Sequence, residues 1–236
     1  MTSTAKLSLP LLQPSQAQKH VTVNEALSRL DGLTALILVS RSQATPPAVA
    51  TEGAAYGLPA DASGAWEGKG GAVALFLNEG WVFVSPTRGW RAWIADENAP
   101  AIHDGANWRA GALALSASGA GCFMHVREFE HAVAPGATSL TSVPIPGPVM
   151  VLAVTARVIE PLTGTLSGWR LGSADAEDRF GSGMGLAAGS FANGLLSTPM
   201  TYFEPEPLLL TAEDGEFAAG VVRIAVHYFE PSLPGL

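Results

Sequence analysis

The chain has 236 residues, of which 47% are hydrophobic and 14% charged, with a formal net charge of −8 and a pI near 5.0. Its basic residues are scattered, which argues against the clustered cationic surface that nucleic-acid backbones require. No apolar run approaches the roughly 18 residues of a membrane span, and residues 1–16 lack the apolar core of a signal peptide. Synthesis in the cytoplasm is therefore expected. The low share of charged residues separately favours an oligomer that covers apolar surface between its subunits.

An amphipathic helix is expected near the start, within LPLLQPSQAQKHVTVNEALSRLDGL at residues 9–33. Ser15 suits the N-cap position, and apolar side chains then recur every three or four residues. They form a narrow seam, typical of helices that pack against other helices, which comprises Val23, Leu27, Leu30, Thr34 and Ile37. Two alternatives remain open: the helix lies on a sheet of its own domain, or residues 33–39 form a separate turn or strand.

A small tryptophan-rich β module is predicted to follow. The run GAVALFLNEGWVFVSP predicts a hairpin around Asn78 and Glu79, with Gly80 supplying a positive φ. The tryptophans of this part fit a buried core better than an exposed surface that stacks on sugars; they are Trp66, Trp81, Trp90, Trp93 and Trp108.

The second half of the chain is predicted to be all β. Residues 111–121, GALALSASGAG, are expected to be a linker, and residues 122–236 a β-sandwich of about seven or eight short strands. Alternation predicts one inward face of Met150, Leu152, Val154, Ala156 and Val158, and another of Val222, Ile224, Val226 and Tyr228, with Thr155, Arg157, Arg223, Ala225 and His227 facing outward. The predicted fold class is mainly β: an N-terminal helix plus a small tryptophan-rich module at 1–110, then a jelly-roll-like β-sandwich.

Several segments carry a resemblance to a known family. They are LPLLQPSQAQKHVTVNEAL, GWVFVSP, GWRAWIADE and DGANW in the first half, and TARV, DRFGSGMG and YFEPEPLLLTAEDGEFAAGVVRIAVHYFEP in the second. Together they resemble alphaproteobacterial prophage tail-fibre-like proteins and the head spikes of gene transfer agents, whose N-terminal half is a domain of initially unknown function.

The resemblance implies a structural component of a phage-like particle that adheres to the capsular polysaccharide of the recipient cell. Its N-terminal part would anchor the spike to other capsid or spike proteins, and its C-terminal part would bind. A homo-oligomer is implied, for which we expect a homotrimer joined through the seam of Val23, Leu27, Leu30 and Ile37. We expect a non-enzymatic adhesin on the virion surface; the alternatives are a polysaccharide depolymerase and a base subunit that attaches another spike to the capsid.

A sugar site usually combines an aromatic ring with planar polar groups. In the second half of the chain the candidate rings are Trp169 and Tyr202, and the candidate polar groups are Arg170, Asp178 and Arg179. Trp169 fits the protein core equally well.

Other chemistry is less expected. The acidic loop at 175–178 offers the paired carboxylates of a depolymerase, although such residues are more often solvated turn residues. His125, His131 and His227 lack a metal-ligand spacing, so no metal site is predicted. The glycines of GMGLAA, starting at Gly183, follow a charged segment instead of a buried strand, so no nucleotide and no other cofactor is expected.

Overall fold

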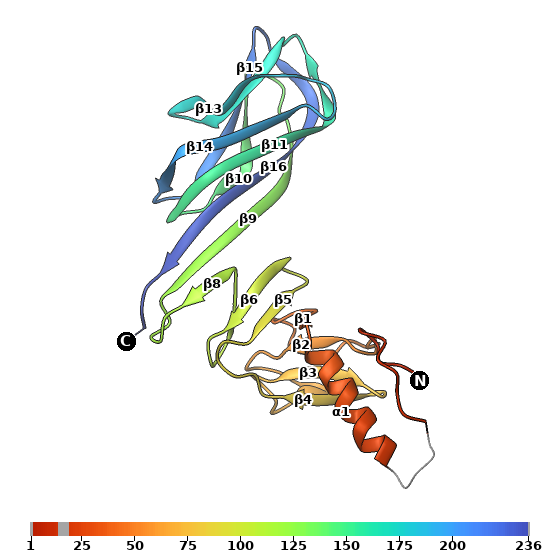
Figure 1. Ribbon diagram of the computed structural model, residues 1–236. Coiled ribbons are helices and arrows are strands. Elements are labelled where there is room, and N and C mark those ends of the chain that lie inside the picture. The colour runs from red at the N-terminus through yellow and green to blue at the C-terminus, as the bar shows by residue number, and fades with distance from the viewer. Residues whose placement is uncertain (1, 14–18, 236) are drawn as a thin grey trace. The chain divides into compact units, whose positions relative to one another are not determined.

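The protein is described from a computed structural model, which places residues 2–13 and 19–235. The chain divides into two compact units, with the boundary between Gly121 and Cys122. Figure 1 shows sheets in both units, and within the described residues α1 is the single α-helix. The mainly β fold class with an N-terminal helix is therefore confirmed.

The first unit contains two sheets, with strand orders β1–β5–β6–β7 and β2–β3–β4. Its elements are α1 (Lys19–Leu33), β1 (Ile37–Leu38), β2 (Ala55–Gly57), the 3-10 helix η1 (Gly64–Trp66), β3 (Val73–Leu77), β4 (Gly80–Val84), β5 (Arg91–Ile94), β6 (Ala99–His103), β7 (Trp108–Ala110) and β8 (Ala112–Leu115). β8 lies in the segment predicted to be a linker, so part of that segment is a strand.

A buried carboxylate fastens the N-terminal segment, residues 2–11, to α1. Asp31 accepts hydrogen bonds from the hydroxyl of Thr4 and from the backbone N–H groups of Lys6 and Leu7, at 2.7 to 2.9 Å. Burial by itself raises the pKa of Asp31, but these hydrogen bonds and the charge of Lys6 outweigh it and hold the pKa below its ordinary value. Asp31 is therefore an ionised anchor for the segment that precedes the helix.

The helix lies on its own sheet, next to β3 (Figure 1). Gly32 allows the close approach, because a Cβ at this position would lie 3.0 Å from a methyl group of Leu75. Earlier in α1, the amide of Asn24 accepts from the backbone N–H of Leu12 at 2.8 Å and donates to its carbonyl at 3.0 Å. The open alternative of a helix on its own domain's sheet is thus the observed one; the predicted N-cap, Ser15, lies outside the described residues.

The predicted seam is cut short at the C-terminal end of the helix. α1 ends at Leu33 because the chain turns through Ala35, which has a positive φ of 45°, and Ile37 therefore lies in β1. The continuous helix through Ile37 was wrong, and the alternative of a separate strand within 33–39 was correct. On α1 itself Leu30 is 60% exposed and Val23 41% exposed, while Leu27 is half-buried.

Most tryptophans of the first unit belong to its core. Trp66 and Trp108 are buried, and Trp66 packs edge-on against Trp81 at a ring-centroid distance of 5.0 Å. Trp93 differs: it is exposed and pairs in register with Ile37 of β1, so that two large apolar side chains lie side by side at the surface.

The predicted hairpin joins β3 to β4. Its two-residue loop is Asn78 and Glu79, and both have a positive φ, of 51° and 62°. This is the backbone that a type I′ turn demands at both central positions. Gly80 is instead the first residue of β4, so its assignment as the positive-φ residue was wrong.

The second unit consists of two antiparallel sheets, with strand orders β10–β15–β12–β13 and β14–β11–β16–β9. The strands are β9 (Gly121–Ala132), β10 (Thr138–Ile145), β11 (Val149–Gly164), β12 (Gly168–Ser173), β13 (Ala176–Met184), β14 (Phe191–Tyr202), β15 (Glu206–Glu213) and β16 (Phe217–Ser232). Side chains from both sheets share one core, as in a β-sandwich. β11 and β16 are longer than the short strands predicted, and the jelly-roll connectivity stays a prediction.

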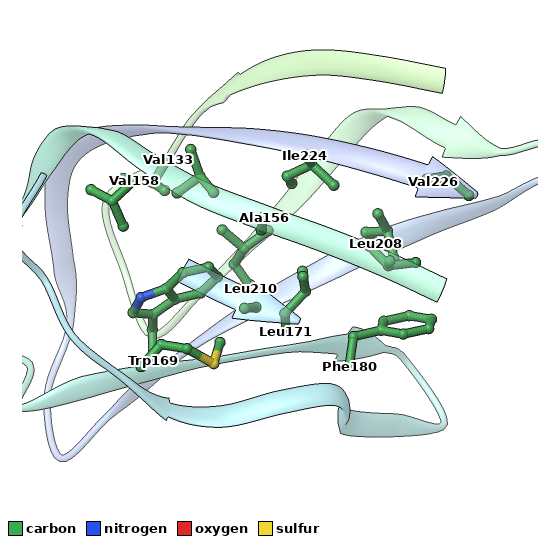
Figure 2. Close-up of a cluster of buried hydrophobic side chains, with 14 of the residues drawn as sticks. Val133, Ala156, Val158, Trp169, Leu171, Phe180, Leu208, Leu210, Ile224 and Val226 are labelled. Atoms are coloured by element: carbon green, nitrogen blue, oxygen red, sulfur yellow. The ribbon is translucent and has the colours of Figure 1, made fainter. Parts of the chain in front are cut away.

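Figure 2 shows the core between the sheets, with Trp169 and Phe180 both pointing into it. Trp169 is 0% exposed, and its indole N–H donates to the carbonyl of Gly185 at 3.1 Å. Ala156, Val158, Ile224 and Val226 also belong to this core, which confirms the predicted inward faces in these parts of β11 and β16.

The alternation predicted for β11 fails at its start. A register shift between Val151 and Ala153 changes the side-chain phase, so that Val151 and Val154 are both buried. Met150 is consequently exposed, although strict alternation predicted that it faces the core.

The first and last strands of the second unit are neighbours, β9 beside β16 (Figure 1). Val133 donates to the carbonyl of Gly220 at 3.0 Å, and Glu130 accepts from Arg223 at 2.5 Å. The pairing runs antiparallel, because the residue number falls along one strand as it rises along the other. The start of β9 and the end of β16 therefore lie at the same end of this sheet.

Candidate functional site

A groove of about 460 Å³ crosses the face of the sheet β14–β11–β16–β9 that points away from the core. Each strand of this sheet contributes to it. The side chains that give it chemical character are Glu128 of β9, Thr155 and Arg157 of β11, Phe191 and Asn193 of β14, and Arg223 of β16.

Strand register builds the groove from two rows of side chains. In one row Phe191, Arg157 and Arg223 are direct cross-strand partners on β14, β11 and β16. In the next row Asn193 and Thr155 are partners, and Thr155 is opposite Ala225. Small side chains in the second row leave space beside the large ones of the first.

An aromatic ring and a cation stand together at one side of the groove. The guanidinium carbon of Arg157 lies 5.8 Å from the ring centroid of Phe191, within cation–π range, and the phenyl group is 62% exposed. Arg157 also donates to the carbonyl of Gly189 at 3.3 Å. No carboxylate pairs with Arg157 among the residues that the structure describes.

Arg223, unlike Arg157, is paired with carboxylates. Its guanidinium donates to Glu130 at 2.5 Å and lies 4.0 Å from Glu128. The hydrogen bond and the charge of Glu130 raise the pKa of Arg223 above its ordinary value. These glutamates also offset the repulsion expected between Arg223 and Arg157, which face each other across the strand pair.

The groove therefore combines an exposed ring with planar hydrogen-bonding groups. A pyranose can stack its apolar face on a ring such as Phe191, while Arg157 and the amide of Asn193 meet its hydroxyl groups. Because the groove is open and solvated, any one contact of this type is weak.

The two rings predicted to bind sugar lie elsewhere. Trp169 is in the core, and Tyr202 is 6% exposed, so neither offers a ring face to a ligand from solution. For Trp169 the core interpretation is the correct one. Burial also raises the pKa of the Tyr202 hydroxyl.

A second groove, of about 380 Å³, is lined by Asp175 and residues 200–206, and the charge of Arg179 acts on Tyr202 there. Arg179 is paired with Asp175 at 2.6 Å, and Ser173 donates to the same carboxylate at 2.6 Å. The hydrogen bonds from Ser173 and Arg179 hold the pKa of Asp175 below its ordinary value. Phe203 at this groove is 76% exposed.

The other two predicted polar residues, Arg170 and Asp178, do not lie with Arg179 and Tyr202. Arg170 lies on β12 and is within ion-pair distance of Glu177, at 3.7 Å, and of Glu213, at 3.5 Å. Asp178 is exposed on β13. The acidic loop thus divides its carboxylates: Asp175 is held by Arg179, and Glu177 faces Arg170.

Sequence reasoning identified part of the first groove. Alternation placed Thr155, Arg157 and Arg223 on an outward face, and the structure agrees. Sequence reasoning missed Phe191 and Asn193, which occupy alternate positions of FANGLL. The next residue is Gly194, and a Cβ at that position would lie 2.5 Å from Phe180. A glycine within a strand often marks a place where another backbone approaches closely, and Gly194 was the signal in the sequence that could have indicated this strand.

Two further observations concern the described part of the chain. None of its helices is long and apolar enough to cross a membrane. Nor do three or more His, Cys, Asp or Glu side chains converge there in a group that could hold a metal ion.

Comparison with known proteins gives limited similarity. A family model described as "Protein of unknown function (DUF2793)" matches residues 23–109, which lie in the first unit. A solved structure described as "Cyanophage Pam1 capsid asymmetric unit" is similar at 22% identity, covers 46% of this chain and 85% of that chain, and has a TM-score of 0.36. No curated protein matches the chain. The first unit therefore contains a segment similar to a family to which no function is assigned.

Proposed function

We propose that this protein is a non-enzymatic structural component of a phage-like particle, and that its second unit binds the capsular polysaccharide of a recipient cell. The family resemblance of the motifs in both halves supports the particle assignment. The observation that carries the binding assignment is the row of Phe191 and Arg157, an exposed ring beside a cation, in an open groove on the face of a sheet.

Adhesion without cleavage is favoured by the small number of carboxylates that line the groove. Glu130 and Glu128 both face Arg223. A glycosidase needs a pair of carboxyl groups across the substrate, whereas Glu128 is the single acidic side chain among the described residues that line this groove.

Self-association would make such weak contacts useful. Val23 and Leu30 on α1, and the pair of Ile37 and Trp93, are apolar and exposed in the single chain. We propose that other copies cover them in a homo-oligomer, for which a trimer is expected, and that the first unit also contacts other capsid or spike proteins. Several linked grooves raise avidity by about 10² to 10⁴ over one groove, without any new type of contact.

The direct test is co-sedimentation of the full chain with encapsulated cells and with cells that lack a capsule. We expect the protein to pellet with encapsulated cells only. Phe191→Ala should lower the apparent affinity by about tenfold or more, since ring stacking is the largest apolar contact that the groove offers. Incubation with purified capsule should release no reducing ends.

Phe203→Ala is the matched control, because Phe203 is also an exposed phenylalanine, and it lies at the second groove. We expect it to bind as the wild type does. Binding that is lost in Phe203→Ala and kept in Phe191→Ala would assign the site to the second groove instead. Equal pelleting with both cell types would contradict capsule binding, and released reducing ends would support the depolymerase.

A further inference from the structure

We infer that the groove selects an acidic sugar, with the sugar carboxylate bound by Arg157 and the apolar face of its ring on Phe191. This inference rests on the proposed function of the groove and adds the class of ligand. It follows from the unequal treatment of the two arginines that face each other on β11 and β16.

Arg223 is already satisfied by anions of the chain itself, Glu130 at 2.5 Å and Glu128 at 4.0 Å. Arg157 is not: among the described residues it donates to a neutral carbonyl, that of Gly189, at 3.3 Å. A guanidinium has five N–H donors in a planar fork that fits a carboxylate, so most of the donors of Arg157 remain for a ligand. An anionic group is the partner that such a fork prefers.

The charges also fix the direction of the ligand. Phe191 of β14 is the cross-strand partner of Arg157 on one side, and Arg223 with its two glutamates lies on the other side. A ligand carboxylate near Glu128 would be repelled, whereas one near Arg157 can be bound while the ring of the same sugar lies on Phe191. The groove thus has a cationic aromatic side and an anionic side.

The expected selectivity is moderate and depends on salt. Arg157 is solvent-exposed, so a neutral sugar leaves it hydrated and without penalty. The gain from one charge-assisted pair at such a site corresponds to about a tenfold preference. Exposed charges are screened by added salt, so the preference that comes from Arg157 should shrink as ionic strength rises.

The test uses two ligands that differ in one group: methyl β-D-glucuronide, with a carboxylate at C6, and methyl β-D-glucoside, with a hydroxymethyl group there. Both are titrated into the full chain by NMR, following the side-chain amide signals of Asn193, which lines the groove and is kept in every variant. We expect the glucuronide to bind the wild type about tenfold more tightly than the glucoside. In Arg157→Gln the two ligands should bind equally, and in Phe191→Ala both should bind more weakly.

Arg127→Gln is the matched control. It removes one positive charge from β9, but Arg127 alternates with Glu128 and Glu130 and donates to Pro144 of the other sheet, at 3.4 Å. It should keep the preference for the glucuronide. Sodium acetate tests the carboxylate alone and should bind more weakly than the glucuronide, because it cannot stack on Phe191.

The outcomes separate this inference from the proposed function. Equal affinity of the two sugars, no binding of either, or a preference that survives in Arg157→Gln overturns the inference. If the wild type nevertheless pellets with encapsulated cells, the proposed function stands. If it fails to pellet with them, the proposed function itself is overturned.

Discussion

Asp31 and Leu7 are joined by a hydrogen bond of 2.7 Å, in which the buried carboxylate accepts from the backbone N–H. The same carboxylate accepts from Thr4 and Lys6. Together with the pairing of Asn24 and Leu12, this explains why polar residues recur in the opening motif. They hold the turn formed by residues 2–11 against the helix.

Asp31→Asn should loosen this segment. The amide can accept through only one of its two side-chain atoms, so at least one buried N–H or hydroxyl loses its acceptor, at a cost of about 1 to 3 kcal/mol. Amide hydrogen exchange at Leu7 should become faster, and proteases should cut more readily within residues 2–13. Asp61→Asn, at an exposed position, is the control and should change neither readout. Unchanged exchange at Leu7 would show that the carboxylate is dispensable.

Trp169 should act on stability rather than on sugar binding. Trp169→Ala leaves a large cavity between the sheets and removes the bond to Gly185, and should destabilise the second unit by about 3 to 5 kcal/mol in urea unfolding. Leu195→Ala, at an exposed position, should stay within about 0.5 kcal/mol. The milder Trp169→Phe should still pellet with encapsulated cells. Loss of binding in that folded variant would restore Trp169 as a candidate sugar contact.

Buried histidines predict a loss of stability in mild acid. Burial lowers the pKa of His131, whose Nε2 is hydrogen-bonded to Ser139 at 2.8 Å. Since the folded state binds this proton less readily than the unfolded state, the free energy of unfolding falls as pH drops through about 6.5, and levels off below the folded pKa. His131→Gln should flatten this slope, measured by urea unfolding at a series of pH values. Burial also lowers the pKa of His103, so His103→Gln should remove a second part of the slope. An identical pH profile in His131→Gln would refute the assignment.

The exposed face of α1 provides a test of assembly. Leu30 is 60% exposed, so Leu30→Asp keeps its charge in water in a separate chain but buries it in an oligomer that uses this face. We expect light scattering to show a lower mass for the variant, with unchanged circular dichroism. Val49→Asp, at another exposed apolar residue, is the control and should retain the wild-type mass. A wild type that is already monomeric at micromolar concentration would refute the oligomer.

Local sequence patterns predicted the strands and their buried faces better than they predicted where the regular backbone is interrupted. The alternation in β16 placed Val222, Ile224 and Val226 correctly, because side-chain period alone decides which face is buried in a regular strand. The prediction failed at Met150, where a register shift moves the phase, and at Ile37, where Ala35 ends the helix geometry. In each case the backbone departs locally from the regular repeat of the strand or helix.

The groove shows why the site was harder to predict than the strands. Its residues come from strands that are distant in the chain, and Arg157 meets Phe191 and Arg223 only through cross-strand register. A single sequence does not reveal which strands are neighbours. The search for aromatic residues also favoured Trp169, since tryptophan is the strongest stacking ring, whereas its size made it more valuable in the core.

Because β9 and β16 are neighbours, the second unit can be replaced as one continuous insertion. Its polypeptide leaves the sheet beside the point at which it arrived, so a replacement sandwich with the same neighbouring first and last strands needs only two short splices. Grafting at Cys122 and Leu233 can then exchange the second unit while the sequence of the first unit is left unchanged.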